Sequence, residues 1–281
     1  MQHISVVGSG TMGNGIAHSF AQHGFKVALI DTNPEALERA LGTIRHNLDR
    51  QIKKEVLTED DKRQILKRIT TYVDLRQGVS RADFVVEAAT ENESIKLGLF
   101  RELDALCPPN TVLATNTSSI SITKIASVTQ RADRVIGMHF MNPVPVMKLV
   151  EVVKGYSTSV DTIHSVIILS ERLGKIPVEV NDYPGFVANR ILMPLINEAI
   201  YALHEGVADR EAIDTVMKLG MAHPMGPLEL ADFIGLDVCL SILRVLHDGF
   251  GHPKYAPCPL LVNMVTAGKL GKKTGQGFYA Y

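Results

Sequence analysis

The chain has 281 residues, of which 46% are hydrophobic and 21% charged, a composition typical of a globular protein. Its formal net charge of -1 gives no electrostatic reason to expect nucleic acid or an anionic membrane as a partner. The three cysteines, Cys107, Cys239 and Cys258, match no disulfide framework or metal-ligand spacing, and no apolar run approaches the ~18 residues that span a bilayer. We therefore expect a metal-free protein of a reducing, cytoplasmic compartment, with no signal peptide before the first strand.

Short apolar runs alternate with helix-like stretches over the first 180 residues. The runs are rich in β-branched residues and nearly continuous in hydrophobicity, as strands buried on both faces of a parallel sheet must be. This alternation indicates a doubly wound α/β domain of the Rossmann type. The expected strands cover residues 4–7, 27–30, 84–86, 112–114, 135–138, 149–153 and 175–180, and the expected helices cover residues 12–23, 34–51, 58–68, 95–106 and 160–173.

The character of the sequence changes at residues 181–185, which read Asn-Asp-Tyr-Pro-Gly and predict a turn. Helical periodicity dominates beyond this point. We therefore expect two domains, 1–183 and 184–281, of which the second is all-helical. The charged residues 45–68 predict a helical pair inserted between the second and third strands. The helices expected in the second domain cover residues 186–205, 210–219, 226–250 and 259–267.

The first expected strand leads directly into Gly8-Ser9-Gly10-Thr11-Met12-Gly13 and then into a helix. A GxGxxG motif alone is weak evidence, but its place between a strand and a helix makes it specific. Gly8 permits a tight turn, Gly10 lets a pyrophosphate approach the backbone, and Gly13 allows the helix to pack closely on the strand. The helix N-terminus offers unpaired N–H groups to the phosphates, so this loop predicts a dinucleotide site.

Asp31 ends the second expected strand, 18 residues after Gly13. A carboxylate at this place accepts hydrogen bonds from ribose hydroxyls and repels a 2′-phosphate, which favours NAD over NADP. The alternative is a structural glycine turn followed by an aspartate that caps a helix. The register of strand, loop, helix and second strand favours NAD, although a nearby cation can offset one aspartate.

Two ionisable residues lie in apolar surroundings. His139 lies among isoleucine, methionine and phenylalanine, and Glu151 lies between two valines. Such residues are costly to bury unless they are paired, and the turn-forming residues 142–145 between them can bring the two together. The ordinary pKa of histidine suits a general base, and a carboxylate beside it stabilises the imidazolium. The alternative is a histidine satisfied within the core.

Further motifs follow in a fixed order along the chain. They are VVEAATEN at 85–92, NTSS at 116–119, GMHFMNPVPVMKLVEVV at 137–153, PGFVANR at 184–190, HPMGPLELADFIGLDV at 223–238 and KKTGQGFYAY at 272–281. Over essentially its whole length the sequence resembles the L-3-hydroxyacyl-CoA dehydrogenase family, and most closely its short, single-function members. The resemblance implies NAD as cofactor and an acyl-CoA substrate, 3-hydroxybutyryl-CoA in particular, oxidised reversibly to the 3-oxoacyl-CoA.

The resemblance also implies roles for individual residues. The catalytic histidine falls on His139, its glutamate partner on Glu151, and two residues that hold the substrate oxygen on Ser118 and Asn189. The family holds CoA with a serine and a lysine of the inserted helices. The lysine corresponds to Lys54, but Asn47 occupies the serine position, so the local CoA contacts stay open. Beyond the glycine-rich loop and Asp31, the NAD contacts fall on Glu91, Lys96, Asn116, Ser118, Asn142 and Lys273.

Some of these residues have ordinary structural interpretations. Ser118 belongs to a stretch whose side chains can cap a helix beginning near residue 120, and Asn189 can be a polar residue of a helical first turn. Glu87 is expected to be a buried structural carboxylate near the cofactor. The charged face at 45–68 is ordinarily solvated, although Arg45, Arg50, Lys53 and Lys54 can meet the phosphates of CoA.

The resemblance implies a homodimer formed by the C-terminal helical domain, with residues 191–196 and 238–246 as its apolar surplus. Two other functions stay open from the sequence. One is a relative that oxidises a free 3-hydroxy acid, such as a sugar acid. The other is a sensor that binds NAD without chemistry. The cationic side chains of the inserted helices favour the CoA substrate. The set of His139, Glu151, Ser118 and Asn189 favours an enzyme.

Overall fold

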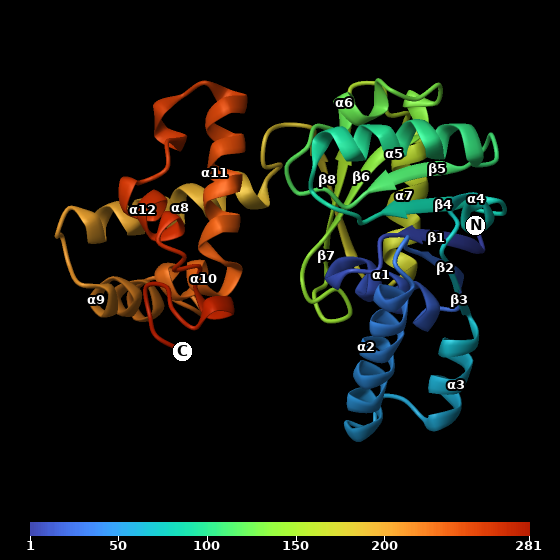
Figure 1. The fold of residues 1–281 in the computed structure, drawn as a ribbon, viewed down its shortest axis with the longest axis horizontal. Helices are drawn as coiled ribbons and strands as arrows, with labels where there is room; N and C mark the ends of the chain where they lie inside the picture. The colour runs from blue at the N-terminus through green and yellow to red at the C-terminus, as the bar shows by residue number, and fades with distance from the viewer. The chain divides into compact units, whose positions relative to one another are not determined.

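The computed structural model describes all 281 residues and divides them into two compact units, Met1–Asp182 and Tyr183–Tyr281 (Figure 1). The first unit is an α/β structure and the second is helical, so the predicted fold class is confirmed. None of the helices combines the length and apolar character that a membrane-spanning segment needs.

The first unit is built on an eight-stranded sheet with the strand order β3-β2-β1-β4-β5-β6-β7-β8. All neighbouring strands are parallel except β6 and β7, which are antiparallel. From β1, successive strands are added first on one side (β2, β3) and then on the other (β4, β5, β6). In such sheets ligands bind at this switch point, beyond the carboxyl ends of the strands. The strands are β1 (His3–Val7), β2 (Lys26–Ile30), β3 (Ile69–Tyr72), β4 (Phe84–Glu87), β5 (Val112–Thr115), β6 (Val135–Phe140), β7 (Leu149–Lys154) and β8 (Ile176–Asn181).

Helices cover both faces of this sheet, because successive strand residues point to opposite sides. On one face, α1, α2 and α7 enclose the main hydrophobic core, to which β1 contributes Ile4 and Val6. On the other face, Ser5 donates a hydrogen bond to the carbonyl of Gly78 in α4, and Gly137 lies against Ile122 of α6. The helices are α1 (Thr11–Gln22), α2 (Pro34–Lys53), α3 (Glu59–Lys67), α4 (Leu75–Val79), α5 (Glu93–Leu106), α6 (Ile122–Ala126), η1 (Ala132–Arg134) and α7 (Val160–Arg172).

The edge strand β3 and the short helix α4 were not predicted. The four residues of β3 are mostly half-exposed, so no hydrophobic period marks them, and the strand forms by pairing with residues 27–30 of β2. The inserted pair therefore lies between β2 and this edge strand, not directly before the strand at 84–86. Its first member is the continuous 20-residue α2, which begins at Pro34 as expected, so the pair extends over more of the chain than residues 45–68. Figure 1 shows α2 and α3 extending away from the sheet side by side.

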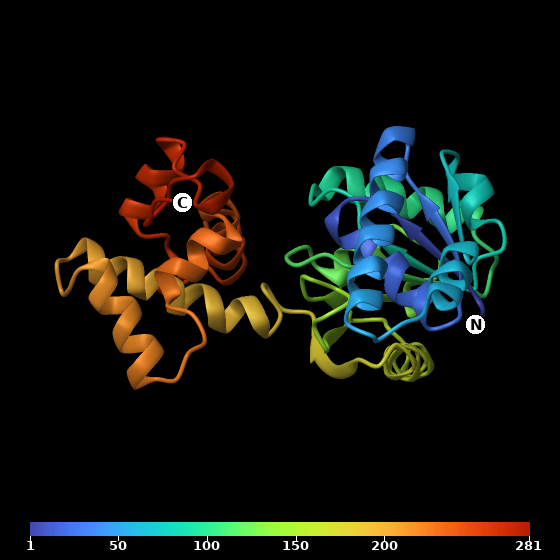
Figure 2. The same ribbon diagram turned by 90° about the horizontal axis from the view of Figure 1, so that it is seen from below.

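The second unit packs helices around a core of its own that includes Ile196, Leu240 and Leu243. The helix expected over 226–250 is two helices, because Gly235 between them has φ +104°, a conformation that few other residues adopt. Likewise, the helix expected over 210–219 continues beyond α9 only as a π-helical turn. The elements, seen from below in Figure 2, are α8 (Ala188–His204), α9 (Arg210–Thr215), η2 (Val216–Gly220), α10 (Pro227–Ile234), α11 (Leu236–Phe250), η3 (Pro253–Tyr255), α12 (Pro259–Thr266) and η4 (Lys272–Thr274).

Candidate active site

A histidine and a glutamate face each other on adjacent strands. The turn at 142–145 reverses the chain, so β6 and β7 pair antiparallel with His139 directly opposite Glu151. His139 Nδ1 lies 2.8 Å from Glu151 Oε2, and the two side chains are only 8% and 3% exposed. This register is decisive, because a slip of one residue would turn the two side chains to opposite faces of the sheet. The predicted pairing across the turn is therefore present.

Ser118 lies on the other side of the imidazole, with its Oγ 2.9 Å from His139 Nε2. A Glu151 carboxylate can only accept, so in the neutral imidazole Nδ1 carries the proton and Nε2 is the acceptor for the Ser118 hydroxyl. The three side chains therefore form one hydrogen-bonded line with a basic nitrogen in the middle. Such a line is the arrangement of an oriented general base.

The capping interpretation of Ser118 does not hold. Ser121 is the N-cap of α6, and its Oγ accepts from the N–H of Lys124. Thr117 satisfies the preceding turn by accepting from the N–H groups of Ser119 and Ile120. The hydroxyl of Ser118 is thus not needed by the helix.

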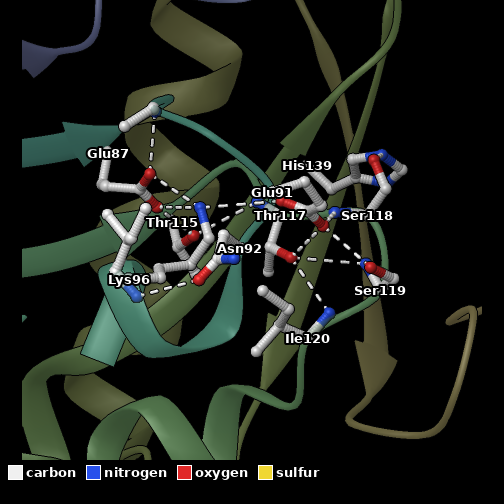
Figure 3. Close-up of polar contacts among 12 residues, drawn as sticks. Glu87, Glu91, Asn92, Lys96, Thr115, Thr117, Ser118, Ser119, Ile120 and His139 are labelled. Atoms are coloured by element: carbon white, nitrogen blue, oxygen red, sulfur yellow. Dashed lines mark hydrogen bonds and ion pairs between the residues drawn. The ribbon is translucent and has the colours of Figure 1, made fainter. Parts of the chain in front are cut away.

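Glu91 holds the loop that carries Ser118 (Figure 3). Its Oε1 accepts from Thr117 Oγ1 at 2.5 Å, from the Ser118 N–H at 2.9 Å and from Ser119 Oγ at 2.9 Å. Partial burial by itself raises the pKa of Glu91. The Lys96 ammonium and the three hydrogen bonds outweigh burial and hold the pKa below its usual range. The carboxylate is thus ionised near neutral pH, and its hydrogen bonds are with residues 117–119, the serine loop.

Lys96 is almost fully buried, and its ammonium lies between two carboxylates. Its Nζ donates to both oxygens of Glu87 at 2.7 and 2.6 Å, and it lies 3.6 Å from Glu91 Oε2. Glu87 also accepts from the N–H of Ala89 and from Thr115 Oγ1. The expected structural carboxylate is therefore present, with a lysine partner that sequence analysis assigned only to cofactor binding.

The glycine-rich loop leaves room where a phosphate needs it. A Cβ on Gly8 would lie 2.5 Å from the carbonyl oxygen of Ala88, and one on Gly13 would lie 1.8 Å from the carbonyl oxygen of Gly8. Around the exposed Gly10, by contrast, nothing lies within 4 Å of such an atom. No side chain caps the N-terminus of α1, so its N–H groups and positive potential face this space. These residues fit the pyrophosphate of a dinucleotide.

Asp31 is fastened to the same loop. Its Oδ2 accepts from the Ser9 N–H and hydroxyl, and its Oδ1 accepts from the Asn33 N–H. Partial burial raises the pKa of Asp31, but these hydrogen bonds outweigh burial and lower it overall. Asn33, not Asp31, caps α2 by accepting from the N–H groups of its first turn. The capping alternative is thus excluded, and an ionised carboxylate stands at the end of β2.

Two asparagines complete this edge of the sheet. Asn116 follows β5 and accepts from the N–H of Phe140 through Oδ1, while the exposed Asn142 follows β6. Gly8 follows β1 and Asp31 follows β2, so all these residues lie at the carboxyl ends of parallel strands. These four expected residues therefore gather at the edge where such sheets bind ligands.

A groove of ≈ 240 Å³ lies between α2 and the turn at 142–145. Asn47 and Lys54, both expected at the CoA site, line it together with Arg50 and Gln51, as the helical spacing of 47, 50, 51 and 54 requires. Arg45 and Lys53 do not line it. The opposite wall is Pro143, Pro145 and Val146, which sequence analysis did not connect with the inserted helices.

The remaining expected residues belong to the second unit. Asn189 is the second residue of α8, as expected. Lys273 lies in the short turn η4, where its Nζ donates to Asp237 Oδ2 at 2.7 Å. The tail around it is held by Asp232, whose carboxylate accepts from the N–H groups of Phe278 and Tyr279.

Comparison with known proteins agrees over the whole chain. Residues 3–183 match the family model "3-hydroxyacyl-CoA dehydrogenase, NAD binding domain", and residues 185–281 match "3-hydroxyacyl-CoA dehydrogenase, C-terminal domain". A "Probable 3-hydroxybutyryl-CoA dehydrogenase" of Bacillus subtilis (strain 168) is 57% identical, with 100% of this chain and 98% of that protein covered. The human "Hydroxyacyl-coenzyme A dehydrogenase, mitochondrial" is 44% identical, with coverage of 100% and 91%.

A solved structure has the same fold. The crystal structure of (S)-3-hydroxybutyryl-CoA dehydrogenase from Ralstonia eutropha is similar with a TM-score of 0.97 and 50% sequence identity. The similarity covers 100% of this chain and 99% of that one.

Proposed function

The chain belongs to the 3-hydroxyacyl-CoA dehydrogenase family, and from this premise we propose that it is an NAD-dependent 3-hydroxybutyryl-CoA dehydrogenase. It interconverts L-3-hydroxybutyryl-CoA and acetoacetyl-CoA by hydride transfer. The observation that carries the proposed chemistry is the hydrogen-bonded line of Ser118, His139 and Glu151 at the carboxyl edge of a NAD-binding sheet.

In the direction of oxidation, His139 Nε2 takes the proton of the substrate's 3-hydroxyl group. The Glu151 carboxylate stabilises the imidazolium that forms, because it stays hydrogen-bonded to Nδ1. Ser118 Oγ then turns from Nε2 to hold the reacting oxygen, and Asn189 is the proposed second donor. In reduction, the imidazolium returns the proton to the same oxygen. NAD, when bound, supplies the hydride acceptor for oxidation and, as NADH, the donor for reduction.

The proposed NAD site consists of the glycine-rich loop from Gly8 to Gly13, the N-terminus of α1, and Asp31. The open space at Gly10 fits the pyrophosphate, and the ionised Asp31 suits the ribose hydroxyls. The other proposed contacts are Glu91, Lys96, Asn116, Ser118, Asn142 and, from the second unit, Lys273.

We propose that the groove along α2 holds the CoA moiety. Arg50 and Lys54 supply cations for its phosphates, and Asn47 supplies a hydrogen-bonding amide. The wall formed by Pro143 and Pro145 joins the groove to the turn after His139, so a ligand in the groove can reach the base with its acyl end.

The proposed oligomer is a homodimer formed through the helical unit. Most apolar residues of 191–196 and 238–246 pack in or against that unit's own core, while Ile191 and Val238 are 65% and 40% exposed. Further exposed apolar side chains of this unit are Val216, Leu219 and Met221, which are 58%, 83% and 61% exposed. The proposed compartment is the cytoplasm, in keeping with three buried free thiols.

The proposed function is tested by following NADH oxidation with acetoacetyl-CoA, longer 3-oxoacyl-CoA substrates and free acetoacetate in parallel. We expect turnover with acetoacetyl-CoA and little with the free acid. A preference for the free acid would identify the chain as a dehydrogenase of free 3-hydroxy acids instead. Binding of NADH without turnover of any substrate would identify a sensor.

A further inference from the structure

Beside the serine loop lies a cluster of three charged side chains, Glu87, Lys96 and Glu91 (Figure 3). Glu87 and Lys96 are 0% and 2% exposed, so their ion pair is buried. A buried ion pair is costly unless every remaining hydrogen-bonding position is used. Here both carboxylate oxygens of Glu87 receive the ammonium and one further donor each, so the pair is fully coordinated.

Two routes lead from Glu87 to Ser118. In the first, Glu87 fixes Lys96, whose ammonium lies 3.6 Å from Glu91, and Glu91 accepts from the Ser118 N–H. In the second, Thr115 Oγ1 donates to Glu87 Oε2 and accepts from the N–H of Thr117 at 3.2 Å. Glu87 itself does not touch Ser118, so any effect on the serine passes through these neighbours.

We propose that Glu87 is a positioning residue that, through Lys96 and Thr115, holds the Ser118 hydroxyl against His139 Nε2. This inference rests on the proposed function of Ser118 as the residue that holds the reacting oxygen. A merely structural role would require only that the charges be paired. The first route, however, ends on Glu91, which accepts from the Ser118 N–H. The second ends on the N–H of Thr117, the residue before Ser118. Both routes therefore act on the backbone that carries the Ser118 hydroxyl.

Neutralising Glu87 shows why position matters. In Glu87→Gln the buried ammonium keeps only one carboxylate within reach, that of Glu91. A buried cation with one partner is drawn toward it. The ammonium then competes with the donors of the serine loop for the Glu91 carboxylate. The loop shifts, and the Ser118–His139 hydrogen bond lengthens.

The test measures kcat and KM for acetoacetyl-CoA with NADH in a double-mutant cycle of Glu87→Gln and Ser118→Ala. We expect Glu87→Gln to lower kcat by about 10-fold to 100-fold, the scale of a small misplacement at a reacting centre, with KM nearly unchanged. In the Ser118→Ala background the same change should cost no further kcat, because no hydroxyl remains to be positioned. An equal loss of kcat in both backgrounds would overturn the proposal.

Asp104→Asn is the matched control. Asp104 lies on the same helix as Lys96, and it holds Arg131 at 2.7 Å in a partly buried ion pair. Its loss should lower the melting temperature but leave kcat intact. If Glu87→Gln behaves in the same way, the role of Glu87 is structural and the proposal is wrong.

A second readout does not depend on the substrate. The ¹⁵N chemical shift of His139 Nε2 in the protein without ligands reports the hydrogen bond from Ser118, and Glu87→Gln should move it toward the value of Ser118→Ala. An unmoved shift contradicts the positioning role even if the proposed function fails. Where Glu87→Gln does not fold, Thr115→Val removes the second route with a residue of similar shape, and the same shift decides.

Discussion

At the scale of single residues, the chemistry depends on one imidazole with a different partner on each nitrogen. Glu151 determines which nitrogen carries the proton, and Ser118 occupies the basic one until a substrate oxygen replaces it. Because both partners are present before any ligand binds, the base is already oriented, and the reaction needs no rearrangement to align it.

His139→Gln tests this base directly. Gln keeps a hydrogen-bonding side chain but takes no proton, so kcat should fall by roughly 10²-fold to 10⁴-fold, the usual contribution of a positioned base. Titration of the variant with NADH should give a nearly unchanged Kd, since His139 is not among the proposed cofactor contacts. Near-normal turnover in this variant would contradict the role of His139 as the base.

Asp31→Asn tests the discrimination between the two nicotinamide cofactors. Removing the negative charge at the end of β2 removes its repulsion of a 2′-phosphate, while the amide can still accept from the Ser9 N–H. The ratio of kcat/KM for NADPH to that for NADH should rise by about 10-fold, equivalent to ~1.4 kcal/mol. An unchanged ratio would show that other residues decide the preference.

At the scale of elements, α2 has two different faces. Leu37, Ala40, Ile44 and Leu48 are buried in the core, while residues at 47, 50 and 54 line the groove opposite the turn at 142–145. The long α2 therefore couples the sheet to a cationic surface that a helix of ordinary length would not provide.

Lys54→Glu tests the groove as a CoA site. Reversing this charge should raise KM for acetoacetyl-CoA several-fold, with kcat almost unchanged, because the charge lies far from the reacting atoms. The effect should vanish with acetoacetyl-pantetheine, which lacks the nucleotide phosphates. Lys53→Glu is the matched control, since Lys53 is the neighbouring exposed lysine of the same helix but does not line the groove. Equal effects of the two variants would refute a specific site.

The packing of α1 on α2 makes stability depend on pH. His18 in α1 is fully buried, its Nδ1 has no partner, and burial lowers its pKa from 6.5 to about 4, although a hydrogen bond of the ring with Gln22 acts in the opposite direction. Between pH 6.5 and 4 the unfolded chain binds a proton that the folded chain does not. The free energy of unfolding therefore decreases as the pH is lowered from 6.5 to 4, by about 3 kcal/mol in total.

Denaturant unfolding at several pH values measures this dependence. His18→Gln should remove the His18 part of the slope between pH 6.5 and 4, whereas His46→Gln, at an exposed position on α2, should leave the profile as it is. If His18→Gln retains the full slope, other groups cause it.

At the scale of the whole molecule, two compact units divide the work. The first carries the sheet, the phosphate loop and the base, and the second carries Asn189, Lys273 and the exposed apolar side chains of Val216, Leu219 and Met221. Exposed apolar side chains that gather on one part of a protein surface commonly mark an interface with a partner chain.

Leu219→Asp tests the proposed homodimer. A charge at this 83% exposed position should be neutral in a monomer but costly in an apolar interface, so light scattering after gel filtration should show a shift from dimer toward monomer. Tyr156→Asp in the first unit, at a 92% exposed position, is the control and should stay dimeric. A Leu219→Asp variant that remains dimeric would place the interface elsewhere.

The local sequence pattern alone determined much of this protein's structure. The strands and helices buried in the core follow from hydrophobic period, the dinucleotide loop from glycines between a strand and a helix, and the pair of His139 and Glu151 from two charges beside one turn. Each of these signals is contained within a short window of sequence, and the physical cost of an unpaired buried charge makes the pairing predictable.

Only the tertiary structure decided the rest. Strand β3 exists because β2 offers it an edge, and the break at Gly235 depends on a backbone conformation that composition does not reveal. The groove joins residues of α2 to prolines about a hundred positions later, and Glu87 meets Thr115 across two strands. Such contacts follow from the order of strands in the sheet, which is set by the burial of all its faces at once rather than by any single segment.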